Sequence, residues 1–211
     1  GLFLCIIIIK YRKNIFNKKF IKDYFNGIEI ILKDLNNNKI FEIVKFLKEL
    51  RKKQGRLFII GVGGSAANSS HAVNDFRKLC NIDASSPCDN VSEITARTND
   101  EGWESIFVET LKVSNLGPKD AIFVLSVGGG SSEKQISINL IEAVKYSKKK
   151  KAKVLGIVGM KEGYTYKKGD IVIDVPKFDN NLITPYSESF QSIILHCIVS
   201  HPLLKFKPTK W

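Results

Sequence analysis

Short apolar runs alternate with helical stretches along this chain, and that alternation restricts its fold more than any other feature. Each run is about as long as a buried strand and is bounded by glycine or polar residues. The runs cover residues 57–61, 121–126, 154–159 and 171–175. Strands with both faces buried are apolar at nearly every position, so these runs indicate buried parallel strands. Helical spacing follows in residues 66–79, 133–149 and 187–199. This order predicts an α/β fold with a doubly wound parallel sheet.

The first quarter of the chain has the pattern of two helices. Apolar residues recur at helical intervals over residues 16–35 and again over residues 40–50. Asparagines separate the two stretches, and Gly55 marks the end of the second. We therefore expect residues 1–55 to form an N-terminal helical extension, folded as a hairpin. No linker rich in Pro, Gly or Ser divides the rest of the chain, so we expect one structural unit over residues 56–200 and a basic tail over residues 201–211.

The formal net charge of +12 raises the question of a nucleic-acid partner. Residues 1–55 and residues 145–211 each carry +8, whereas residues 56–144, which contain the glycine-rich motifs, carry −4. The excess is mostly lysine, and the run from Lys148 to Lys151 is typical of a solvated helix face. We therefore expect no nucleic acid as partner.

Membrane insertion and disulfide bonding are also disfavoured. Residues 2–9 are apolar, but a membrane-spanning helix needs about 20 such residues. The cysteines have neither C-x-x-C nor zinc-ribbon spacing; they are Cys5, Cys80, Cys88 and Cys197. Scattered single cysteines in a chain with a large core indicate reduced thiols, so we expect a cytoplasmic protein with no membrane partner.

Two glycine- and serine-rich loops follow predicted strands and precede predicted helices. The first is Gly61-Val62-Gly63-Gly64-Ser65, which matches neither a Walker A motif nor G-x-G-x-x-G. Alone it is either an anion site at a helix N-terminus or a tight turn. The second runs from Ser126 through three glycines to Ser131 and Ser132. Both loops lie at carboxyl ends of strands, where such sheets bind ligands, and their neutral donors suit a sugar phosphate.

Ionisable residues follow on two of the predicted helices. His71 and Asp75 are four residues apart and share a helix face. Glu188 and His196 are eight residues apart, which places them about 80° from one another around the helix axis. Each pair by itself is more typical of a protein surface or core than of a catalytic site, and His196, with its apolar neighbours, is typical of a core residue.

Together, these motifs resemble the SIS (sugar isomerase) phosphosugar-binding family, and most closely its phosphoheptose isomerases. The matching elements are the two loops, His71 with Asp75, the Thr98-Asn99-Asp100 segment, and Thr184-Pro185 followed by Glu188 and His196. The likeness covers about residues 17–200. It implies a five-stranded parallel sheet sandwiched by helices, and a homotetramer with its sites between subunits.

The resemblance also implies roles for individual residues. Ser65, Ser126 and Ser131, with Gly63 and Gly64, would hold the phosphate. Asn99, Asp100 and Glu188 would contact the sugar. Asp75 and His196 would be the acid/base pair. In some members of the family the positions of His71, Asp75, Glu188 and His196 bind zinc, and no redox cofactor is expected.

Several positions depart from the usual family pattern, and these departures bear most on which sugar phosphate is the substrate. Val62 replaces an asparagine, Val127 and Gly128 replace two hydroxyl residues, and Asp75 and Glu188 replace a glutamate and a glutamine. A branch of the family has a Ser-Val-Gly-Gly-Gly loop of this kind.

The expected activity is the interconversion of a ketose phosphate and an aldose phosphate, with sedoheptulose 7-phosphate as the substrate. Proton transfer through an enediol requires an acid/base pair and no redox chemistry. An isomerase for another sugar phosphate is the nearest alternative. The competing class is a non-catalytic SIS module that acts as an adaptor or as a sugar-phosphate-sensing regulator.

Overall fold

The computed structural model describes residues 18–209 and confirms the α/β fold. Within these residues the sheet has five strands, all parallel, in the order β2-β1-β3-β4-β5. They are β1 (Arg56–Gly61), β2 (Asp83–Ser85), β3 (Ala121–Ser126), β4 (Lys153–Val158) and β5 (Ile171–Asp174). Four of them are the apolar runs of the sequence. The remaining strand, β2, has three residues, too few to form a recognisable run, but it agrees with the five strands that the SIS resemblance implies.

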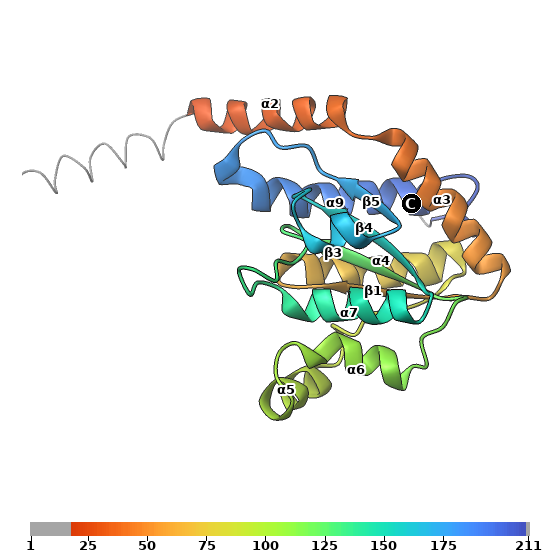
Figure 1. Cartoon of the computed structure of the whole chain (residues 1–211). Coiled ribbons are helices and arrows are strands. Elements are labelled where there is room, and N and C mark those ends of the chain that lie inside the picture. Colours follow the sequence, from red (N-terminus) through yellow and green to blue (C-terminus); the bar gives the residue numbers. More distant parts are fainter. Residues whose placement is uncertain (1–17, 210–211) are drawn as a thin grey trace, which may run out of the picture.

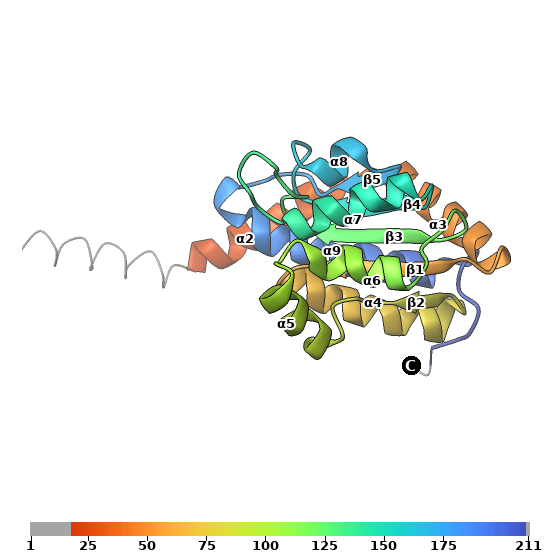
Figure 2. The same cartoon turned by 60° about the horizontal axis from the view of Figure 1, so that its bottom comes forward.

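Helices cover both faces of the sheet (Figures 1 and 2). One face carries α3 (Asn37–Lys52), α4 (Gly64–Cys80) and α9 (Ile183–Ser200), with α2 (Lys18–Asp34) lying along α9. The other face carries α6 (Ser105–Val113), α7 (Ile138–Lys149) and α8 (Tyr164–Lys168), with α5 (Val91–Asp100) packed on α6. A short 3-10 helix, Asn180–Leu182, precedes α9.

The central strand β3 explains why the runs are apolar throughout. Phe123 and Leu125 pack into the core with α4 and α9, whereas Ile122 and Val124 pack into the core with α6 and α7. Because successive side chains of a strand point to opposite faces, a sheet covered on both sides needs apolar residues at every position. All six residues of β3 are buried.

The chain changes from one face of the sheet to the other between β1 and β3. Helix α4 leaves β1 on one face, and α7 leaves β3 on the other. The two strands are neighbours, and Gly61 pairs with Leu125 at their carboxyl ends. Parallel sheets bind ligands at such a switch point, because loops from both faces diverge there. Both glycine-rich loops begin at this place.

The N-terminal helices belong to the same core as the sheet. Ile31 of α2 and Ile43 and Leu47 of α3 are fully buried and share a cluster with Phe123. The two helices confirm the predicted pair, but α3 runs on from α2 at an angle and does not fold back along it (Figure 1). Helix α2 packs against α9, and α3 packs against α9 and β5, so each helix is held by the rest of the domain without packing along the other.

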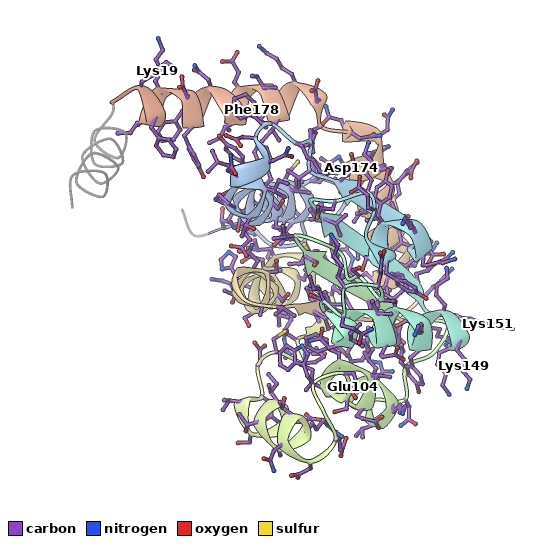
Figure 3. The ribbon with its side chains drawn as sticks, turned by 60° about the vertical axis from the view of Figure 1, so that its left-hand side comes forward. Lys19, Glu104, Lys149, Lys151, Asp174 and Phe178 are labelled. Atoms are coloured by element: carbon purple, nitrogen blue, oxygen red, sulfur yellow. The ribbon has the colours of Figure 1, made fainter. Side chains whose placement is uncertain are left out.

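The lysine run at residues 148–151 is exposed to solvent, whereas the predicted basic tail packs on the domain. The predicted helix end at Lys148 to Lys151 is solvated, and Figure 3 shows Lys149 and Lys151 projecting from the end of α7. Residues 201–209, expected as a basic tail, pack back on the domain: Leu204 is fully buried, and the amide of Phe206 donates to the carbonyl of Leu79 at 2.7 Å. No helix in the described part of the chain is long and apolar enough to cross a membrane.

An ion pair joins the amino ends of β1 and β3. The Arg56 guanidinium donates to both carboxylate oxygens of Asp120, at 3.2 and 2.7 Å, and the Arg56 amide adds a third bond of 3.0 Å. Asp120 is 6% exposed. Burial by itself would raise the pKa of the Asp120 carboxyl, but the bonds from Arg56 and from the Gly117 amide outweigh it and hold this pKa below its usual value.

We predict that Asp120→Ala lowers the free energy of unfolding by about 2–3 kcal/mol at pH 7, because it leaves the Arg56 and Gly117 donors without their acceptor. A carboxyl with a depressed pKa stabilises the fold above its unfolded pKa of about 3.9 and loses that effect as the pH falls through its folded pKa. The difference between wild type and variant should therefore shrink in acid. Urea titrations from pH 7 to pH 3 measure it. Glu142→Ala, which breaks the exposed Glu142–Lys145 pair, is the control with little effect. A difference that stays constant over this pH range would contradict the assignment.

Candidate active site

The first glycine-rich loop leads directly into α4. Gly63 has φ +64° and ψ −129°, a conformation that only glycine adopts without strain. Ser65, in the first turn of α4, is 1% exposed, and its Oγ has no hydrogen-bond partner among the described residues. An unsatisfied buried hydroxyl costs about 1–3 kcal/mol, which a bound acceptor would recover. No acidic residue of α4 itself occupies its first turn, and the amide end of a helix suits a ligand that accepts hydrogen bonds.

Glu188 of α9 lies against this loop. A Cβ on Gly64 would collide with the Glu188 carboxylate, so the absence of a side chain at position 64 allows the close approach. A carboxylate accepts hydrogen bonds and repels phosphate, which suits contact with sugar hydroxyls.

The second loop differs from the helix predicted over residues 133–149. That helix begins only at Ile138, because residues 131–136 form a small excursion closed by mutual backbone bonds between Ser131 and Ile136. The Ser126 hydroxyl accepts from the Gly129 amide at 2.9 Å, and the Ser131 hydroxyl accepts from the Lys134 amide at 3.2 Å. Each hydroxyl keeps its proton free to donate to a ligand.

The start of α8 holds the second loop in place. The amides of Tyr164 and Thr165 donate to the carbonyls of Gly130 and Gly129, at 2.8 and 2.9 Å. The two glycines have φ values of +85° and +71°. These bonds fix the backbone of the loop that carries the Ser126 and Ser131 hydroxyls.

Helices α4 and α9 run side by side, and Asn68 joins them between the loop and the ionisable residues. Its Nδ2 donates to the Glu188 carbonyl at 2.9 Å and to Gln191 Oε1 at 3.0 Å, while the Ser192 hydroxyl donates to Asn68 Oδ1 at 2.8 Å. We did not predict Asn68 from the sequence. The sequence did offer a signal for Asn68: it lies one helical turn after Ser65 and one turn before His71, so it is on the same side of the helix.

His71, Asp75 and His196 come together along the same pair of helices. His71 Nε2 lies 2.9 Å from His196 Nε2 and 3.4 Å from Asp75 Oδ2, and His196 Nε2 lies 3.7 Å from Asp75 Oδ2. The histidine side chains are 54% and 56% exposed, and that of Asp75 is 14% exposed. His196 is therefore not a core residue, despite its apolar neighbours in the sequence.

The three side chains fit a metal ion. Their ligand atoms all lie within 4.8 Å of one another. Ligands at about 2.0–2.1 Å from a tetrahedral zinc ion are about 3.3 Å apart, close to the spacings found here. Glu188 is outside this group, since it lies two turns earlier on α9, about 12 Å from His196 along the axis.

Asn99 and Asp100 lie at the end of α5, not on α4 or α9. Both are exposed, and the Asn99 amide donates to the Asp100 carboxylate at 2.6 Å. Helix α5 stands at the edge of the molecule, packed on α6 (Figure 1). Among the described residues, neither side chain has a hydrogen bond or ion pair to the glycine-rich loops, and their contact with a sugar stays a prediction.

The cysteines in the described residues are free thiols. Burial raises the pKa of Cys80 to about 11 and also raises the pKa of Cys88, whose Sγ donates to the Gly61 carbonyl at 3.3 Å. Neither is a thiolate at neutral pH, so neither is a nucleophile. Cys5 lies outside the described residues.

Known proteins similar to this chain include enzymes of sugar-phosphate metabolism. No family model matches the chain. It is 32% identical over 155 residues to the lincomycin biosynthesis protein LmbN of Streptomyces lincolnensis, covering 71% of the chain and about half (54%) of that longer protein. It is 27% identical over 200 residues to the phosphoheptose isomerase of Helicobacter pylori (strain ATCC 700392 / 26695), covering 89% of the chain and 96% of the relative.

Solved structures share the fold. A phosphoheptose isomerase from Francisella tularensis has a TM-score of 0.73 at 19% identity, over 86% of the chain and 92% of that structure. One from Neisseria gonorrhoeae has a TM-score of 0.73 at 18% identity, over 90% and 96%. The five-stranded parallel sheet, the two loops at its switch point and these relatives together show that the chain has the SIS fold and is similar in sequence to phosphoheptose isomerases.

Proposed function

We propose that the protein is a phosphosugar isomerase that interconverts a ketose phosphate and an aldose phosphate, with sedoheptulose 7-phosphate as its substrate. One observation carries the proposal: α4 and α9 place Asp75, His71 and His196 in contact, on the same helix pair whose first turns border the glycine-rich loops. The similarity to phosphoheptose isomerases supports it.

The loops would hold the phosphate. The amide end of α4, the unpartnered Ser65 hydroxyl and the outward protons of Ser126 and Ser131 are donors that suit a phosphate group. Binding at a group that does not react orients the sugar for the chemical step.

Asp75 and His196 would carry the proton transfers. Ketose–aldose interconversion removes a proton from one carbon, forms an enediol, and returns a proton to the neighbouring carbon while a hydroxyl proton moves between the two oxygens. A carboxylate and an imidazole within 3.7 Å of one another can share these tasks. His71, in contact with both, would orient them.

The spacing of these parts favours a long substrate. Ser65 and Asp75 are ten residues apart on α4, about 15 Å along the helix axis. A seven-carbon sugar phosphate extends farther from its phosphate than a five-carbon one. Glu188, beside Gly64, would accept hydrogen bonds from the sugar hydroxyls nearest the phosphate end.

As an alternative to direct proton transfer by the same atoms, His71, Asp75 and His196 would hold a zinc ion, which fits their spacing and leaves a fourth coordination position for the substrate. When bound, it would polarise the sugar carbonyl and stabilise the enediolate. We also propose a cytoplasmic homotetramer, on the resemblance alone.

A non-catalytic SIS module that senses a sugar phosphate is the alternative class. Such a protein would need the loops but not the acid/base group. The contact among Asp75, His71 and His196 favours the enzyme, and solvent-deuterium exchange at C1 and C2 separates the two. An absence of exchange and of isomerisation for C5–C7 sugar phosphates, with and without added zinc, would contradict the isomerase proposal.

We predict that Asp75→Asn and His196→Ala each lower kcat at least about 100-fold, since each removes one proton-transfer group. Binding of inorganic phosphate at the loops should stay near the wild-type value. Coupled turnover assays and calorimetry measure the two effects. Cys197→Ser changes an exposed neighbour of His196 and should behave as wild type. Full activity in His196→Ala would refute its role.

Zinc content gives a second test. We predict about one zinc per chain in wild type, and at least a tenfold weaker affinity in His71→Ala, because a ligand is lost. Glu188→Ala, distant from the three ligands, should keep its zinc but raise KM. Metal analysis after dialysis against a competing chelator gives the zinc content, and turnover assays give KM. Loss of zinc in Glu188→Ala would place Glu188 in the metal site.

A further inference from the structure

Two buried polar atoms without a partner lie on the paired helices α4 and α9. Among residues 18–209, three buried side-chain atoms have no hydrogen-bond partner, and two of them are Ser65 Oγ on α4 and Gln191 Nε2 on α9. Ser65 is 1% exposed, and Gln191 is 0% exposed. A buried donor without an acceptor is costly, so both groups call for a partner other than a side chain.

The bonds of Asn68 determine which end of the Gln191 amide is free. The Glu188 carbonyl can only accept, so the Asn68 atom that lies 2.9 Å from it must be Nδ2. The same nitrogen lies 3.0 Å from Gln191, which must therefore present its oxygen to Asn68. The Ser192 hydroxyl donates to Asn68 Oδ1 at 2.8 Å. Gln191 Nε2 is thus directed away from Asn68, with both of its protons unused.

The free ends of Gln191 and Ser65 lie close together along the helix pair. Ser65 is three residues before Asn68, about 4.5 Å along the axis of α4, and residues three apart are neighbours on a helix surface. Asn68 in turn contacts the Gln191 side chain. Gln191 Nε2 and Ser65 Oγ form no direct bond. Two hydrogen bonds through one water span up to about 5.5 Å, so a single water can bridge groups that are one helical turn apart.

We propose that Gln191 is a positioning residue for the Ser65 hydroxyl and acts through one buried water between them. The inference rests on the proposed function, in which Ser65 binds the substrate phosphate, and deepens it. An amide nitrogen can only donate, so the water accepts from Gln191 Nε2 and has both of its own protons to donate. One of them goes to Ser65 Oγ. A hydroxyl that accepts from this water directs its own proton elsewhere, which leaves that proton for the phosphate.

This arrangement removes the ambiguity of a serine hydroxyl. A free hydroxyl rotates and can either donate or accept, whereas Ser65 meets the phosphate as a donor whose direction is already set. Asn68 contributes to the same effect, because a Gln191 amide turned end for end would place its nitrogen against Asn68 Nδ2. The polar contacts between α4 and α9 therefore act on phosphate binding without touching the substrate.

A double-mutant cycle on phosphate binding tests this coupling. Gln191→Met keeps the length of the side chain and removes the donor, so the affinity for inorganic phosphate should fall about threefold to tenfold. Ser65→Ala removes the hydroxyl that Gln191 orients. The double variant should therefore bind phosphate no more weakly than Ser65→Ala alone. Ser131→Ala is the matched control: Ser131 lies on the other loop, its oxygen accepts from the Lys134 amide, and its loss should multiply with that of Gln191→Met.

Calorimetric titration of each full-length protein with inorganic phosphate gives the affinities, and thermal unfolding confirms that each variant is folded. Wild-type affinity in Gln191→Met would overturn the inference, as would losses that multiply when Gln191→Met is combined with Ser65→Ala. A crystal structure of the wild type needs no variant. It should show a water within hydrogen-bond distance of both Gln191 Nε2 and Ser65 Oγ, and a structure without that water would also overturn the inference.

The same measurements separate this inference from the proposed function. If wild type binds phosphate and exchanges substrate protons while the losses multiply, only the role of Gln191 fails. If wild type neither binds phosphate nor exchanges protons, the proposed function fails as well.

Discussion

The pairing of β1 with β3 is the constraint on which the rest of the structure depends. These strands are in parallel register from Leu57 with Ala121 to Gly61 with Leu125, and the bonds between Arg56 and Asp120 join their amino ends. Because the crossover helices leave the two strands on opposite faces, their carboxyl ends must diverge into separate loops. The glycine-rich loops therefore face one place without a long insertion, and two helix amide ends border it. The pairing of β1 with β3 thus carries a stabilising ion pair at the amino ends of the strands and brings both glycine-rich loops together at their carboxyl ends.

The seam between α4 and α9 provides the other half of the site. Three levels of contact follow one another along it: Gly64 with Glu188, Asn68 with Gln191 and Ser192, and His71 and Asp75 with His196. The first turns lie at the glycine-rich loop, and the ionisable group lies about 15 Å farther along the axis. In the proposed function, helix geometry thus keeps phosphate binding and proton transfer apart. The Asn68 bonds join the two helices between these places.

The net charge of +12 has little to do with this site. The lysines of the α7 end are solvated, and Lys148 and Lys153 both pair with Asp170. The proposed function assigns phosphate binding to neutral donors and helix ends instead, and these lose little conformational freedom on binding because the backbone fixes them.

The sequence by itself determined the fold class, the strand positions and the loops. Fully apolar runs such as residues 121–126 have one interpretation in an α/β chain, because only strands covered on both faces need them. Helical spacing also determined that His71 and Asp75 share a face. The sequence could not show β2, whose three residues form no run, nor that residues 131–136 leave the helix, since a local backbone bond overrides the helical spacing there. Only the tertiary structure decided what meets across α4 and α9. It joined His196 to His71, placed Glu188 at Gly64 away from that cluster, and left Asn99 and Asp100 on an outlying helix. Those outcomes depend on how two helices more than 100 residues apart are aligned by packing and by Asn68, and no local pattern carries that information.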